Sequence, residues 1–163
     1  MALFAIPNPK KTINVDFNID KVKKAILTIP LINKKYKFTK SNEVLNQYTL
    51  EALEFLSVGV YIDFNLSTVS ENKTEITIEI RRKVGSFDQS HEITNANKHL
   101  EVLIENLSKT IMYSESEIEN LKKAEVDKII MQKEKEKKIN KRNLIIAGVI
   151  VFIIIIFNLI NKK

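Results

Sequence analysis

The sequence predicts an α+β domain with a single antiparallel sheet of about five strands, covered by a long amphipathic helix. Three stretches, at residues 11–19, 58–68 and 73–82, carry apolar residues at every second position, which is typical of strands with one buried face. Between residues 95 and 111 the apolar residues follow the spacing of a helix. After the domain, the sequence predicts a helical stalk and one C-terminal transmembrane helix.

The first strand leads into a short helix. Asp20 is expected to cap this helix and Pro30 to end it, because proline cannot donate the helical hydrogen bond. Four apolar residues between them share one side of the helix: Val22, Ala25, Ile26 and Ile29.

Two weaker strands follow, "KKYKFTK" and "EVLNQYTLEAL", separated near Ser41 and Asn42. The two strongest strands come next, and the polar "SENK" between them predicts a hairpin turn. A loop, "GSFDQSHE", is expected to precede the long helix, which begins near Asn95. The apolar side of that helix consists of Leu100, Leu103, Ile104, Leu107 and Ile111.

This element order resembles a reduced form of the helix-grip fold of the START and polyketide-cyclase-like (SRPBCC) lipid-binding superfamily. Four segments within residues 10–113 carry the resemblance: "NVDFNIDKVKKAIL", "VGVYIDFNL", "TEITIEIRRKVG" and "NANKHLEVLIENLSKTI". The chain has fewer strands than full-length members and lacks their usual second short helix.

The resemblance implies an apolar ligand held between the sheet and the long helix. The wall of such a site would consist of Val15, Phe17, Val60, Ile62, Phe64, Ile76, Ile78, Ile80, Leu103 and Leu107. The alternative is that the same side chains simply fill the core, since a small domain has little apolar surface to spare and protein interiors pack densely. Periodicity alone does not separate the two interpretations.

Charge and composition exclude several classes of function. The net charge is +6, but residues 1–113 hold 15 basic and 13 acidic residues, while residues 114–163 hold 11 and 7. The front domain therefore does not predict the concentrated basic face of a nucleic-acid-binding protein. The chain has no cysteine, and its two histidines lack metal-ligand spacing, so we expect no disulfide, no metal site and no cofactor.

No catalytic set is apparent in the sequence. His91 and Glu92, with Asp88 in the same expected loop, are a conceivable acid–base group, although polar loop residues are more often simply solvated. A basic cluster at the end of the last strand is a candidate contact for an anionic headgroup or phosphate, with a solvated strand end as the alternative. It consists of Arg81, Arg82 and Lys83.

The connector at residues 114–143 contains no glycine or proline and is rich in Glu, Lys and Ile, which favours a long helix. Ser114 and Glu117 have the spacing of a capping box, so the helix is expected to begin there. The apolar residues of the connector do not sustain a heptad, and a solvated spacer is preferred over a coiled coil.

Residues 144–160 hold one polar side chain, Asn158, and are predicted to form the transmembrane helix. Basic residues flank this span: Lys137, Lys138, Lys141, Arg142, Lys162 and Lys163. Because most basic residues precede the span, the positive-inside rule predicts a cytoplasmic front domain. Because three residues follow the predicted span, a tail-anchored topology is expected. The start of the chain, "MALFAIP", lacks the basic region of a signal peptide.

The predicted organisation is an N-terminal segment (1–9), a helix-grip-like domain (10–113), a charged stalk (114–143), a transmembrane helix (144–160) and a basic tail (161–163). The leading hypothesis is a membrane-tethered, non-enzymatic module that binds a lipid or another apolar small molecule at the cytoplasmic membrane surface. The alternative is a tail-anchored protein-interaction or scaffold domain with a fully packed core. A membrane enzyme with a cyclase-like pocket is a third, more distant hypothesis.

Overall fold

The computed structural model describes the backbone of residues 6–53 and 58–160. The side chains of Lys141 and of residues 143–160 lie outside the described part. The chain divides into two compact units, Met1–Ile118 and Glu119–Lys163, which are treated separately.

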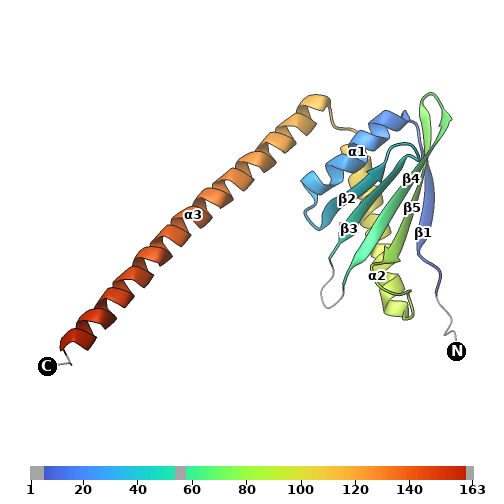
Figure 1. The fold of residues 1–163 in the computed structure, drawn as a ribbon. Helices are drawn as coiled ribbons and strands as arrows, with labels where there is room; N and C mark the ends of the chain where they lie inside the picture. The colour runs from blue at the N-terminus through green and yellow to red at the C-terminus, as the bar shows by residue number, and fades with distance from the viewer. Residues whose placement is uncertain (1–5, 54–57, 161–163) are drawn as a thin grey trace. The chain divides into compact units, whose positions relative to one another are not determined.

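The first unit contains one antiparallel sheet of five strands in the spatial order β1-β5-β4-β3-β2 (Figure 1). The strands are β1 (Lys10–Val15), β2 (Tyr36–Asn42), β3 (Gln47–Ala52), β4 (Val60–Ser70) and β5 (Lys73–Arg82). The predicted α+β class and single sheet are therefore confirmed. Strands β2 to β5 form successive hairpins, whereas β1 crosses over to pair with β5, so β1 and β2 are the two edge strands.

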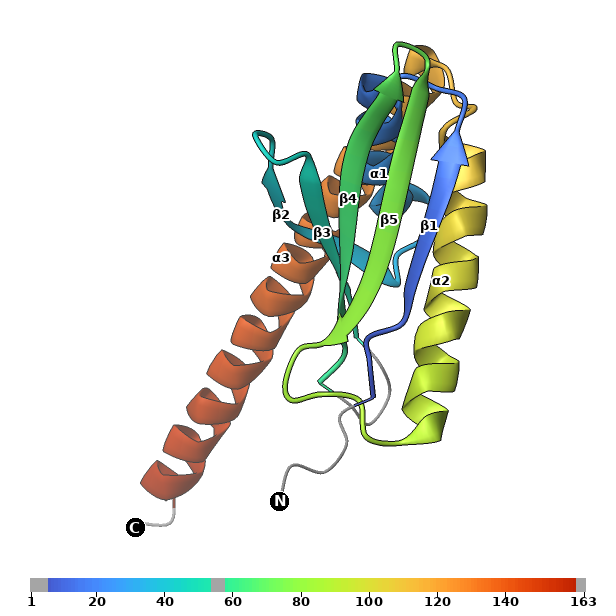
Figure 2. The same cartoon turned by 90° about the vertical axis from the view of Figure 1, so that its right-hand side faces the viewer.

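Helices α1 (Ile19–Ile32) and α2 (Ser90–Thr110) supply the layer that covers the sheet (Figure 2). Their apolar stripes join the inward residues of the strands in one buried cluster, which includes Ile26 and Ile29 of α1 and Leu103 and Leu107 of α2. The alternating burial along β4 and β5 reflects the alternating sequence, because successive strand side chains point to opposite faces. The element and strand order agree with the helix-grip arrangement that the resemblance implies.

The ends of α1 differ from the sequence prediction. Asn18, and not Asp20, is the N-cap, and its side-chain oxygen accepts a hydrogen bond from the backbone N–H of Lys21 at 2.9 Å. Pro30 lies inside the last turn rather than ending the helix. Its missing N–H removes one helical hydrogen bond, but the backbone N–H of Asn33 still donates to the carbonyl of Ile29 at 2.9 Å.

Helix α2 begins at Ser90, about five residues before the predicted start. Gln89 is its N-cap and makes no side-chain capping bond, so the usual signal of a helix start is absent. His91 and Glu92 therefore lie in the first turn of a helix and not in a loop. Glu92 is well placed there, because a carboxylate is favourable near a helix N-terminus.

Helix α3 runs from Glu115 to Ile160, so the stalk is helical as expected. The predicted capping box is confirmed. The backbone N–H of Ser114 donates to the Glu117 carboxylate at 2.7 Å, and the N–H of Glu117 donates to the Ser114 hydroxyl at 3.3 Å. Lys137, Lys138 and Arg142 are exposed.

Among the helical residues whose side chains are described, no stretch is long and apolar enough to cross a membrane. The predicted span at 144–160 is helical in its backbone as the last part of α3, and its side chains lie outside that description. The predicted flanking residues Lys141, Lys162 and Lys163 lie outside it too.

Gly59 precedes β4 with a backbone φ of +91°, and a Cβ there would lie 2.2 Å from the carbonyl oxygen of Ala52. Gly85 has a similar φ of +73° but no atom within 4 Å of such a Cβ.

We expect Gly85→Ala to lower the free energy of unfolding by about 1 kcal/mol, the cost of the left-handed conformation alone. Gly59→Ala should lower it clearly more, because the strands must also shift.

Urea unfolding followed by circular dichroism measures both values. Equal losses for the two variants would show that the contact with Ala52 is unimportant.

Candidate functional site

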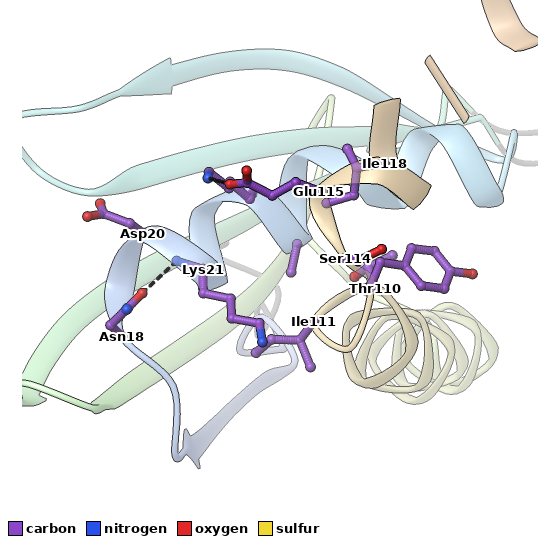
Figure 3. A pocket seen from close by; sticks show the side chains of 11 residues that line it. Asn18, Asp20, Lys21, Thr110, Ile111, Ser114, Glu115 and Ile118 are labelled. Atoms are coloured by element: carbon purple, nitrogen blue, oxygen red, sulfur yellow. Dashed lines mark hydrogen bonds and ion pairs between the residues drawn. The ribbon is translucent and has the colours of Figure 1, made fainter. Parts of the chain in front are cut away.

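A surface cavity of about 370 Å³ lies where the N-terminus of α1 meets the C-terminus of α2 and the first turn of α3. All of its lining residues belong to the first compact unit. Figure 3 shows that α1 supplies one wall and the segment from Thr110 to Ile118 supplies the other. The apolar part of the lining is Ala25, Ile111 and Ile118, and its charged part includes Lys24 and Glu115.

The α1 wall is held by contacts that start in the preceding link. The hydroxyl of Thr74 on β5 donates to the carbonyl of Phe17 at 2.8 Å, which ties the link to the sheet. The Lys21 ammonium lies 4.7 Å from the centre of the Phe17 ring, a cation–π distance. Together with the Asn18 cap, these contacts fix the first turn of α1.

An ion pair joins the two walls. The Lys24 ammonium lies 2.5 Å from the Glu115 carboxylate, and both side chains are exposed. The hydrogen bond from Lys24 lowers the pKa of the Glu115 carboxyl, and the same pairing raises the pKa of Lys24. Water screens such an exposed pair, so it positions the first turn of α3 without adding much stability.

The predicted ligand wall is found in the core. Eight of its ten side chains are buried, with exposed fractions of 0–2%: Val60, Ile62, Phe64, Ile76, Ile78, Ile80, Leu103 and Leu107. The other two, Val15 and Phe17, are partly buried against the same cluster. The structure thus brings the predicted residues together.

Among the described residues, these side chains pack tightly against one another. A cavity large enough for a small molecule, even a closed one, would leave accessible surface on the side chains around it. Ile62, Phe64 and Ile78 are 0% exposed. A ligand between the sheet and α2 would therefore have to push the packed layers apart, and the ligand-wall assignment stays a prediction.

Of the three basic residues at the end of β5, Arg81 and Lys83 both lie against the Tyr61 ring, whereas Arg82 faces α2. Arg81 points to the outer face of the sheet and pairs with Asp63 at 2.5 Å, whereas Arg82 pairs with Glu92 on α2 at 3.0 Å. Lys83 pairs with Glu51 on β3 at 2.7 Å. An anionic headgroup would have to compete with a carboxylate at each of them, so this assignment too stays a prediction.

The outer face of the sheet carries a polar network that the sequence analysis did not identify. Asp63 accepts hydrogen bonds from the Thr49 hydroxyl at 2.6 Å and from Arg81. The Tyr61 ring lies 4.6 Å from the Arg81 guanidinium carbon and 5.3 Å from the Lys83 ammonium. Such cross-strand pairs stabilise a solvated sheet face.

A buried polar pair also escaped the sequence analysis. The Tyr36 hydroxyl and Nδ1 of His99 are 3.1 Å apart, and both residues are almost fully buried. Burial raises the pKa of Tyr36 to about 12. His99 thus has a structural role between β2 and α2. Its place on the apolar side of α2 could have indicated that it is buried.

No family model matches the chain, and no curated protein matches it. Solved structures with related folds share little sequence with it. An uncharacterised protein from Bacillus thuringiensis is 6% identical, with a TM-score of 0.49 over 66% of this chain and 100% of the other. A START superfamily protein from Mycobacterium smegmatis is 13% identical, with a TM-score of 0.42 over 70% of this chain and 98% of the other.

The di-domain aromatase/cyclase BexL is 9% identical, with a TM-score of 0.46 over 65% of this chain, which spans only 45% of BexL.

Substitution of Ile78 by Phe tests whether the core is filled. In a packed core the larger ring is expected to lower the free energy of unfolding by about 1–3 kcal/mol. Beside a ligand cavity the ring would enter free space, and stability would stay unchanged or rise. Ile78→Val is the control, with an expected loss of about 1 kcal/mol in a packed core. Urea unfolding monitors both.

Substitution of Lys24 by Met tests the ion pair across the cavity. Because Lys24 holds the pKa of Glu115 below its ordinary 4.5, the variant should titrate this carboxyl at higher pH. In the unsubstituted chain the ion pair is fully formed at a pH above 4.5, the ordinary pKa of a glutamate carboxyl. The ion pair is lost as the pH falls through the lowered pKa of Glu115. NMR titration of the carboxyl carbons measures the change.

Lys109→Met is the matched control, because Lys109 lowers the pKa of Glu105 in the same way. This control should leave Glu115 unchanged. A Glu115 titration that does not respond to Lys24→Met would contradict the pairing.

Proposed function

We propose that the protein is a single-pass, membrane-tethered, non-enzymatic binding module that engages its partner through the surface of the front domain. The burial of the inward side chains is the observation that carries this proposal. The described side chains expected to line an internal ligand site belong to one buried cluster with apolar residues of α1 and α2, which supports binding at the surface. This favours the interaction domain over the carrier of an enclosed ligand.

Membrane tethering is supported by the apolar sequence of residues 144–160, which as a helix of about 26 Å is slightly short of the hydrocarbon core, a deficit that flanking lysines and mild bilayer thinning can cover. The continuous helical backbone of α3 through these residues is compatible with that assignment. The excess of basic residues before the span favours a cytoplasmic front domain.

A small amphipathic ligand is a second candidate partner. The cavity between α1, α2 and the first turn of α3 favours it, because apolar residues and charged groups meet there in a volume of about 370 Å³. The lipid-binding hypothesis would then concern this cavity or a core that opens.

Fractionation and labelling test the tether. The chain has no cysteine, so Val84→Cys introduces a single exposed thiol in the front domain. In intact cells a membrane-impermeant maleimide should leave this thiol unlabelled, and lysis should expose it. Deletion of residues 144–160 should move the protein from the membrane fraction to the soluble fraction. Labelling of intact cells would refute the cytoplasmic placement.

Truncation after Ile118 tests the mode of binding. Solvent extraction of this purified unit, followed by mass spectrometry, should yield no stoichiometric lipid if binding occurs at the surface. One lipid per chain would instead favour a core or cavity that accepts the ligand.

A further inference from the structure

The charges of the front domain are unevenly distributed along its sequence, although Glu43 in the β2–β3 turn directly follows the most basic stretch. Residues 20–42, which form α1 and the edge strand β2, hold seven lysines and one aspartate, a net charge of +6. The rest of residues 1–113 holds eight basic and twelve acidic residues, a net charge of −4. The near-balance of the whole domain therefore hides a basic side, which the sequence analysis did not find because it counted the domain as one.

Apolar side chains are exposed on the same side. The turn between β2 and β3, at the free margin of the sheet in Figure 2, places Val44 and Leu45 at its apex with exposed fractions of 90% and 59%. Phe38 on β2 is also exposed. We call the following residues the hairpin edge: Lys35, Lys37, Phe38, Lys40, Val44 and Leu45.

The turn is held by its own polar atoms. The backbone N–H of Leu45 donates to the side-chain oxygen of Asn42 at 3.2 Å, and the N–H of Asn46 donates to the carbonyl of Glu43 at 3.3 Å. Asn46 adopts a φ of +49°, which asparagine tolerates well. The two apolar side chains contribute nothing to this hydrogen bonding, and polar residues usually occupy such apices.

The turn of the hairpin edge lies beside the turn of α1 that also contacts the start of α3, from which the chain continues toward the predicted span. Lys23 of α1 lies 3.9 Å from Glu43 in the turn, and the next residue, Lys24, pairs with Glu115 at the start of α3. The same turn of α1 therefore contacts both the hairpin and the root of the stalk.

From these observations we propose that the hairpin edge docks on the surface of an anionic lipid bilayer. This inference rests on the proposed membrane tether, which keeps the domain near lipid. Lysines are attracted to anionic headgroups, while exposed apolar side chains gain from burial at the boundary with the acyl chains. A nucleic acid would satisfy the lysines but would offer Val44 and Leu45 no apolar phase.

The experiment uses the full chain with one introduced cysteine, labelled with the environment-sensitive dye nitrobenzoxadiazole. Leu45→Cys places the dye on the hairpin edge. Val84→Cys is the matched control. Val84 is about as exposed as Leu45, at 64%, and it follows the C-terminal end of β5, outside the hairpin edge. Both proteins are reconstituted in phosphatidylcholine vesicles, with and without phosphatidylglycerol.

With phosphatidylglycerol present, we expect the emission at position 45 to rise several-fold, shift to shorter wavelength and be quenched by spin-labelled lipid. The dye at position 84 should report water in both vesicles. Lys37→Glu with Lys40→Glu should abolish the response at position 45. Lys10→Glu with Lys11→Glu, which changes the net charge equally on the other edge strand, should preserve it.

A water-like signal at position 45 in both vesicles overturns the inference, as does an equal response to the two pairs of lysine substitutions. Flotation separates this failure from failure of the tether. Protein that floats with the vesicles while position 45 stays in water refutes only the docking surface. Protein that does not float with the vesicles refutes the tether. In that case the dye emission at position 45 is measured after phosphatidylglycerol vesicles are added to the free protein, and a water-like emission refutes the docking surface as well.

Discussion

The packing of α1 and α2 against one face of the sheet is the constraint on which the other features depend. The two helices run in opposite directions, so the start of α1 and the end of α2 meet at one end of the domain. This meeting creates the surface cavity and brings Lys24 beside Glu115, 91 residues away. The neighbouring residue of α1, Lys23, lies 3.9 Å from Glu43 in the β2–β3 turn. Apolar burial, the main driving force of folding, thereby positions groups that contribute little to stability themselves.

The two faces of the sheet differ in burial and in polarity. Inward side chains of β4 and β5 fill the core, whereas outward ones meet water and form cross-strand contacts around Asp63 and Tyr61. Alternation along a strand makes both possible in one sequence. The inner face is packed against the two helices, and the charged side chains lie on the exterior.

The existence of each strand was predicted because the signal is local, but the first strand ends at Val15 and not at Ile19, which begins α1 with Asn18 as its cap. Strand β5 has the predicted bounds, since its two faces differ at every residue. Helix starts were predicted less well, because Asn18 and Gln89 cap their helices in ways that depend on the adjoining links. Periodicity identified the inward residues but carried no information on whether they enclose a void. The cavity arises from a contact distant in sequence, which no local pattern encodes.

The separate cap of α3 has a mechanical consequence. Ser114 and Glu117 start this helix with their own capping bonds, and its first turn is joined to the rest of the first unit by the link at residues 111–113 and by the exposed Lys24–Glu115 ion pair. Tension on the tail would reach α2 at a single end. The turns of α2 would then detach from the sheet one after another, a peeling geometry that resists force weakly, while β4 and β5 remain paired. A pull on the C-terminal helix would thus detach α2 first and expose the apolar face of the sheet.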